Sequence, residues 1–149
     1  QLCIEIERVE VFMDYYNYTL LNVIESNKQL ELQEIWFTLN ALADLGQLMH
    51  SNEIKVNPFR IESVFVSLKG MPCVYIADNS LTDDEESVVS LGFTILSLVA
   101  MKKVGAAEVT EALVAVRRKS AELGDILERM TKNEVTFSKI VDEIEKLAN

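Results

Sequence analysis

Apolar residues in the first third of the chain recur at helical spacing. One pattern with steps of three and four runs from Ile4 to Ser26, and a similar pattern runs from Leu30 to His50. The break at residues 26–28 is short, so we expect the two helices to be antiparallel neighbours. These patterns predict a helical hairpin over residues 4–50, although Ile4 to Glu7 also alternates as a strand does.

The pattern changes after His50. Pro58 has no backbone donor and cannot lie inside a helix. Two runs rich in β-branched and aromatic residues follow, Glu62–Leu68 and Cys73–Ala77, with Gly70 between them. Glycine supplies the positive φ of a tight turn, so we predict a β-hairpin over about 62–77. A lone hairpin is only marginally stable, so it must pack on the helices or pair with further strands.

The second half of the chain predicts three more helices. Thr82 and Glu85 form a capping box before a helix over 82–104, which is apolar on nearly every side and should therefore be buried. Val109 to Met130 steps as a heptad seam and predicts a helix over 107–130. We expect this seam either to pack inside the domain or to pair with a second copy. An amphipathic pattern predicts the last helix over 134–148.

The expected fold class is therefore α+β and helix-dominated, with about five helices and one β-hairpin inserted between the second and third. The chain of 149 residues has the length of a single compact domain. A charged fraction of 26% with half of the residues hydrophobic excludes disorder. The longest uncharged apolar run, Ser87 to Met101, is too short to span a membrane.

Charge and cysteine content narrow the classes of partner and compartment. The net charge is −10, and residues 1–53 hold nine acidic and two basic side chains. Direct nucleic-acid binding is not expected, because phosphate recognition needs clustered Lys and Arg. Cys3 and Cys73 do not make a disulfide framework. The acidic first residues lack a basic leader segment, so we predict a cytoplasmic protein.

The residues that usually carry chemistry have simpler structural interpretations here. His50, the one histidine, ends a predicted helix, where a cation suits the dipole. Gln47 stands where a di-metal Glu-x-x-His motif needs Glu. Asp83 to Glu86 are typical of a helix start, and Cys73 of a buried strand. We therefore predict no enzyme, cofactor or metal; an enzyme would need His50 and Cys73, or two carboxylates, to meet in a cleft.

Three groups of residues are candidates for contact with a protein partner. The tyrosines beside Asp14 cannot all face one core, because neighbours on a helix point about 100° apart. We expect Met71 and Pro72, at the tip of the predicted hairpin, to form an exposed apolar contact. The basic run before Ser120 suits a phosphate or an acidic partner. The candidates are Tyr15, Tyr16, Tyr18, Met71, Pro72, Arg117 and Arg118.

Residues from about Glu34 to Val104 resemble the Roadblock/LC7 fold family. That family places a helix before a β-hairpin with a glycine turn, here Gly70, and then a long helix with an acidic start, here Asp83 to Glu86. The resemblance implies a dimer with a sheet continuous across the interface and a surface for small GTPases or their regulators. This sequence departs from the family after the central helix, where 107–130 predicts helix instead of further strands.

The function predicted from these observations is a non-enzymatic protein-interaction module. It would be an adaptor or small subunit that acts through helical faces, with a homodimer as its expected state. One alternative is a Roadblock-like scaffold for a small GTPase or its regulator. A second is an acidic inhibitor that mimics nucleic acid, which requires the carboxylates of the first two helices to form a surface row.

Overall fold

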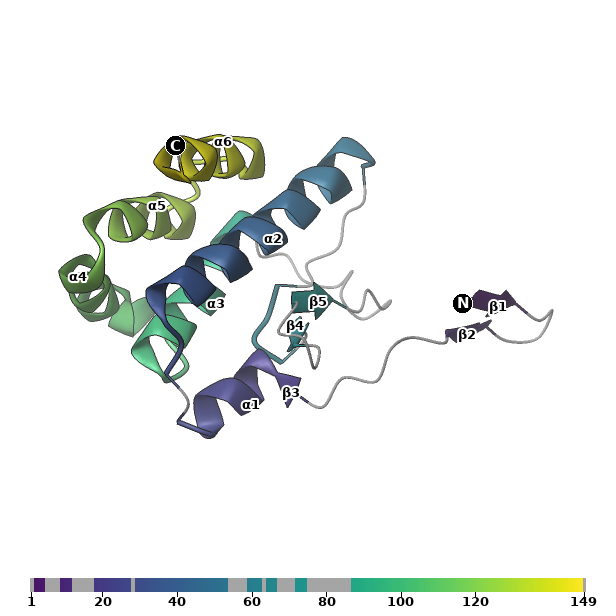
Figure 1. Ribbon diagram of the computed structural model, residues 1–149, viewed down its shortest axis with the longest axis horizontal. Helices are drawn as coiled ribbons and strands as arrows, with labels where there is room; N and C mark the ends of the chain where they lie inside the picture. Colours follow the sequence, from purple (N-terminus) through teal and green to yellow (C-terminus); the bar gives the residue numbers. More distant parts are fainter. Residues whose placement is uncertain are drawn as a thin grey trace.

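Helices dominate the computed structural model, which describes residues 2–4, 9–11, 18–27, 29–53, 59–62, 64–66, 72–74 and 87–148. Within these ranges there are six α-helices (Figure 1). They are α1 (Leu20–Glu25), α2 (Leu32–Ser51), α3 (Ser87–Ala100), α4 (Val109–Lys119), α5 (Ala121–Thr131) and α6 (Phe137–Ala148). A short 3-10 turn, Ala106–Glu108, precedes α4.

The described strands are short and form two antiparallel sheets. β1 (Leu2–Ile4) pairs with β2 (Val9–Val11). The second sheet has the order β3-β4-β5, from β3 (Tyr18–Thr19), β4 (Val64–Val66) and β5 (Pro72–Val74). Tyr18 pairs with Val66, which in turn pairs with Pro72. This sheet contacts α1 and α2.

α3 forms the centre of the core because almost every side of it is apolar. It packs against α1, α2, α4 and α5, and its buried members include Leu91, Ile95, Leu96 and Leu98. The hydroxyls of Ser90 and Thr94 are buried too, and both donate to the carbonyl oxygen of Phe59. Because these hydroxyls are hydrogen-bonded, their burial carries little free-energy cost.

The predicted fold class is wrong. The expected helix over 4–26 is absent from the described part of that range, which holds β1, β2 and β3 and only the six residues of α1. Apolar and acidic residues alternate from Ile4 to Glu7, which is typical of a strand. Val9 and Val11 are β-branched and favour extended backbone. Thr19 then starts α1, since its side chain accepts a hydrogen bond from the Asn22 N–H at 3.2 Å.

The expected β-hairpin over 62–77 is corrected as well. Of the described residues in that range, Val64–Val66 and Pro72–Val74 are strands, and they belong to a three-stranded sheet with β3 instead of a lone inserted hairpin. Residues 67–71 and 75–77, with the expected glycine turn, lie outside the described residues. The third strand adds the pairing that a lone hairpin, only marginally stable by itself, would lack. The body of the fold is therefore helical.

The expected single helix over 107–130 is two helices. Ser120 has extended backbone (φ −157°, ψ 117°), and its hydroxyl accepts a hydrogen bond from the Leu123 N–H at 3.2 Å. Serine favours the N-cap position, so the one polar member of the seam starts a new helix. The break lets both α4 and α5 pack on α3. The seam residues Leu113, Val116, Leu123, Leu127 and Met130 are buried within the chain.

The C-terminal end of α3 also differs from the sequence prediction. The helix ends at Ala100, four residues before Val104, because Met101 adopts the left-handed conformation at φ 59°. The N–H of Lys102 then donates to the carbonyl of Ser97, as at a helix end that closes with a left-handed residue. The predicted capping box at Thr82 and Glu85 lies outside the described residues.

Candidate interaction surface

α2 buries one face and leaves the opposite face in solvent. Its core-facing residues are Ile35, Thr38, Leu39, Leu42, Ala43, Gly46 and Met49. On the other side, Phe37 is 47% exposed and Leu48 is 59% exposed. Eleven residues separate these two side chains, which corresponds to about 20° around the helix and about 16 Å along it. They therefore lie on one line that faces away from the core.

Two further residues complete this line. Ala41 and Asp44 lie between Phe37 and Leu48 at steps of four, three and four, so all four share one helix face. Ala41 is half-buried and Asp44 is exposed. We call these four residues the outer stripe of α2. A single exposed apolar residue is ordinary, but two on one line, three turns apart, have the spacing by which helices contact partners.

The charges of α2 are all acidic. Its sequence holds Glu34 and Asp44 and neither Lys nor Arg. Glu34 has a local role, because its carboxylate accepts a hydrogen bond from the Glu31 N–H at 3.0 Å, at the helix end where negative charge is favourable. In the part of the chain that the structure describes, Asp44 forms no ion pair. Asp44 is thus a solvated carboxylate between two exposed apolar side chains.

Close packing of α6 on α2 holds the outer stripe on a well-supported element (Figure 1). Gly46 permits this contact, since an added Cβ would lie 2.7 Å from the ring of Phe137. The Phe137 ring packs in turn on Phe59, with 5.5 Å between the ring centroids. Gln47 also donates from Nε2 to Ser138 Oγ at 3.4 Å. The face of α2 opposite the stripe is therefore packed within the fold.

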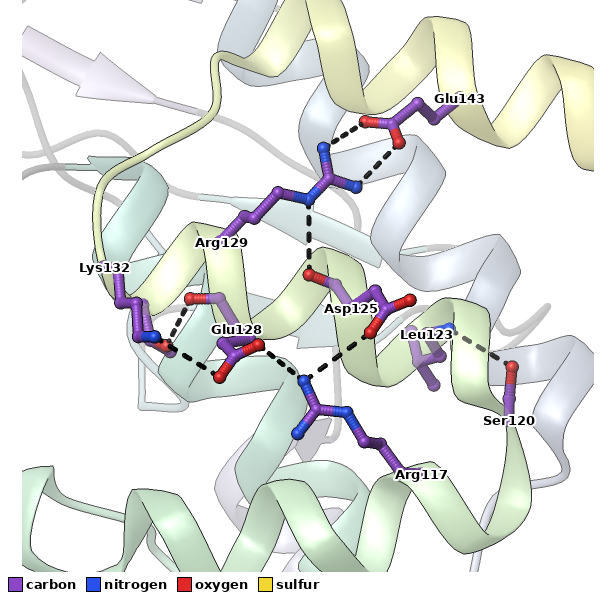
Figure 2. A network of polar contacts seen from close by, with 9 residues as sticks. Arg117, Ser120, Leu123, Asp125, Glu128, Arg129, Lys132 and Glu143 are labelled. Carbon is purple, nitrogen blue, oxygen red and sulfur yellow. Dashed lines mark hydrogen bonds and ion pairs between the residues drawn. The ribbon is translucent and has the colours of Figure 1, made fainter.

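Ion pairs tie α6 to α5 and α5 to α4 (Figure 2). The guanidinium of Arg129 donates to both carboxylate oxygens of Glu143, at 2.9 and 2.7 Å. Arg117 of α4 reaches across to Glu128 at 2.6 Å and to Asp125 at 3.6 Å. A bidentate arginine–carboxylate pair fixes the relative orientation of its two side chains as well as their distance. The Arg129–Glu143 pair therefore helps to orient α6, which in turn packs on α2.

The electrostatics of this network follow from its hydrogen bonds. Hydrogen bonding from Arg129 lowers the pKa of Glu143 against the opposing effect of burial, and the pKa of Arg129 is raised in return. Hydrogen bonds from Arg117 and then Lys132 lower the pKa of Glu128. Both carboxylates are therefore ionised at neutral pH and serve to join helices.

The residues predicted to bind a partner fall into three places. Tyr15, Tyr16 and Met71 lie outside the described residues. Tyr18 and Pro72 both pair with Val66, so the sheet brings two of the candidates into one row. Arg118 is exposed on α4, while the guanidinium of Arg117, on the same helix, is engaged with Asp125 and Glu128.

The sequence interpretation missed Phe37 and Leu48. It followed the apolar line through Leu32, Leu39 and Met49, which faces the core, and did not follow the opposite line. The signal was present, because Phe37, Ala41, Asp44 and Leu48 have the same four-three-four spacing as a buried face. Periodicity alone does not tell which of two apolar lines on a helix is covered.

His50 and Cys73 lie on different elements. His50 is exposed at the last turn of α2 and borders a cavity of about 510 Å³. The other lining residues include Gln47, Ser51, Thr136 and Ser138. Cys73 lies in β5, and Asp83 to Glu86 lie outside the described residues. Among the residues that are described, no three His, Cys, Asp or Glu side chains gather as metal ligands would.

No family model matches the sequence, and no curated protein matches it significantly. Of the helices that the structure describes, none has both the length and the apolar character needed to cross a membrane.

Proposed function

We propose that this chain is a non-enzymatic protein-interaction module that acts through a helical face, the outer stripe of α2. The observation that carries the proposal is the exposure of Phe37 and Leu48 on one line of a helix whose opposite face is buried. Large apolar side chains left in solvent gain free energy when a partner covers them, by about 25 cal/mol for each Å² of apolar surface. The fold gains little from them, since they lie outside its core.

The internal burial of the heptad seam adds support. The packing of α3, α4 and α5 against one another buries Leu113, Val116 and Leu123. The seam therefore leaves little apolar surface for a partner, whereas the outer stripe leaves Phe37 and Leu48 exposed. A contact through the stripe leaves the described core unchanged.

The test is affinity co-purification from the cell that makes this protein, with quantitative mass spectrometry. The Phe37→Gln/Leu48→Gln variant is compared with the unaltered chain. Glutamine keeps helix propensity while it removes the apolar side chain. We expect a recurrent partner whose recovery falls about tenfold or more in this variant, because interface residues of this kind commonly contribute over 1 kcal/mol.

The matched control is Val114→Gln on α4. Val114 is 49% exposed, close to Phe37 at 47%, but it lies on another helix. Its change should leave partner recovery as it is in the unaltered chain. Equal recovery from all three proteins would contradict the proposal. A small GTPase as the partner lost from the stripe variant would favour the Roadblock-like scaffold over a general adaptor.

A further inference from the structure

We infer that the outer stripe of α2 receives an amphipathic helix with basic flanking residues, supplied by a different protein. This inference rests on the proposed function and names the chemistry of the partner. The stripe is about 16 Å long and one residue wide, which fits one helix laid along or across it and not a broad flat surface. Ala41 at its middle has a small side chain, so a second helix axis can approach closely there.

Asp44 decides the charge of the occupant. Any helix that covers both Phe37 and Leu48 also covers Asp44, which lies between them on the same face. A carboxylate taken out of water without a partner is costly, and this cost exceeds the gain from a small apolar contact. Of the described residues, none supplies a cation to Asp44. A basic side chain of the occupant would supply this cation.

A second copy of this chain is a poor occupant. Antiparallel pairing of two stripes would set Phe37 of each against Leu48 of the other and bring the two Asp44 carboxylates within about one helical turn. α2 carries no Lys or Arg that would compensate them. The net charge of −10 adds long-range repulsion between copies and long-range attraction for a basic partner.

The test uses synthetic peptides, because the natural partner is unidentified. Three labelled 18-residue helices share one leucine face and differ in their flanks, which carry lysine, glutamine or glutamate. Fluorescence anisotropy measures their binding to the intact chain at low and moderate salt. We expect the lysine peptide to bind most tightly, the glutamate peptide not to bind, and the binding of the lysine peptide to weaken as salt rises.

Variants separate the stripe from the general charge of the protein. Phe37→Gln/Leu48→Gln should weaken the lysine peptide about tenfold or more, and Asp44→Asn about fivefold. The matched control is Glu122→Gln, which removes the same charge from an exposed site on α5. The control should retain nearly all of the affinity. Circular dichroism confirms that each variant stays helical.

Three results would overturn the inference. Equal losses of lysine-peptide affinity from Asp44→Asn and Glu122→Gln would show that the attraction comes from the net charge of the protein and not from Asp44. Binding of the glutamate peptide at the stripe would show that the stripe accepts a partner with acidic and not basic flanking residues. A concentration-dependent dimer in sedimentation that Phe37→Gln/Leu48→Gln removes would make a second copy the occupant. In each case the co-purification result still stands or falls separately, since it tests the stripe and not the charge of its partner.

Discussion

α3 and α2 are both apolar helices, but they differ in how many of their apolar side chains the fold buries. α3 is enclosed by four other helices, and even its hydroxyls at Ser90 and Thr94 are hydrogen-bonded inside the fold. α2 contributes one face to the same core and leaves Phe37 and Leu48 outside it. The apolar character of α3 is explained by its contribution to the stability of the core. α2 also carries exposed apolar surface that stability does not require, and this surface is the candidate for function.

The largest loss of stability is expected when a core residue of α3 is truncated. Ile95→Ala should lower the free energy of unfolding by about 3 kcal/mol, because Ile95 is fully buried and its removal leaves a cavity. Urea denaturation measures the effect. Leu48→Ala on the outer stripe is the matched change and should cost less than about 0.5 kcal/mol. Similar losses from the two variants would mean that the stripe supports the fold.

A smaller effect is expected where α3 crosses α5. Gly92→Ala would place a Cβ 3.0 Å from Met130 Cβ and 3.3 Å from the backbone nitrogen of Thr131. Overpacking costs about 1–3 kcal/mol and the gain in helix propensity returns about 1 kcal/mol, so we expect a net loss near 1 kcal/mol. Thermal denaturation tests this. Gly105→Ala, which meets only the flexible carboxylate of Glu108, should be close to neutral.

The next effect concerns the pair that orients α6. Glu143→Gln should cost about 1 kcal/mol at neutral pH, because it removes the charge from a two-pronged pair with Arg129. The pKa of Glu143 is lowered in the folded chain. Its stabilising contribution is therefore complete above the unfolded value, near pH 4.3, and is lost as the pH falls through the folded pKa.

Denaturation curves at several pH values follow this loss. The difference between the unaltered chain and Glu143→Gln should be largest at neutral pH and shrink below about pH 4. Glu145→Gln changes an exposed carboxylate on the same helix and should have an effect under about 0.5 kcal/mol. A difference that persists unchanged in acid would show that the glutamine itself packs poorly and that the ion pair contributes little.

The smallest change in stability is expected on the outer stripe itself. Phe37→Gln and Leu48→Gln should each change the free energy of unfolding by less than about 0.5 kcal/mol, because both side chains are about half exposed. The same variants should have the largest effect on partner recovery. A loss of stability comparable with Ile95→Ala would remove the distinction between the two helices.

The parts that the sequence predicted well are those where one local pattern suffices. The second helix was predicted over Leu30 to His50 and is observed as α2, Leu32–Ser51. The last helix was predicted over 134–148 and is observed as α6, Phe137–Ala148. Both have amphipathic patterns at least three turns long, so each pattern by itself predicts that a helix is present.

The errors arose where two local signals compete. Ser120 fits both a polar seam position and an N-cap, and packing on α3 favours the cap. Val9 fits the apolar spacing of a helix, but Val9 and Val11 also favour strand, and pairing with β1 decides the outcome. The local pattern decides neither case, because each outcome depends on a contact with another element of the fold.

By itself, the sequence determined the helical character of the chain, its acidity and the residues available for a core. These properties depend on composition and short-range spacing, which the chain carries without folding. Only the tertiary structure decided that the seam of Val116 and Leu123 closes inside the molecule and that Phe37 and Leu48 stay outside. Burial is a property of neighbours, and neighbours exist only once distant segments have packed together.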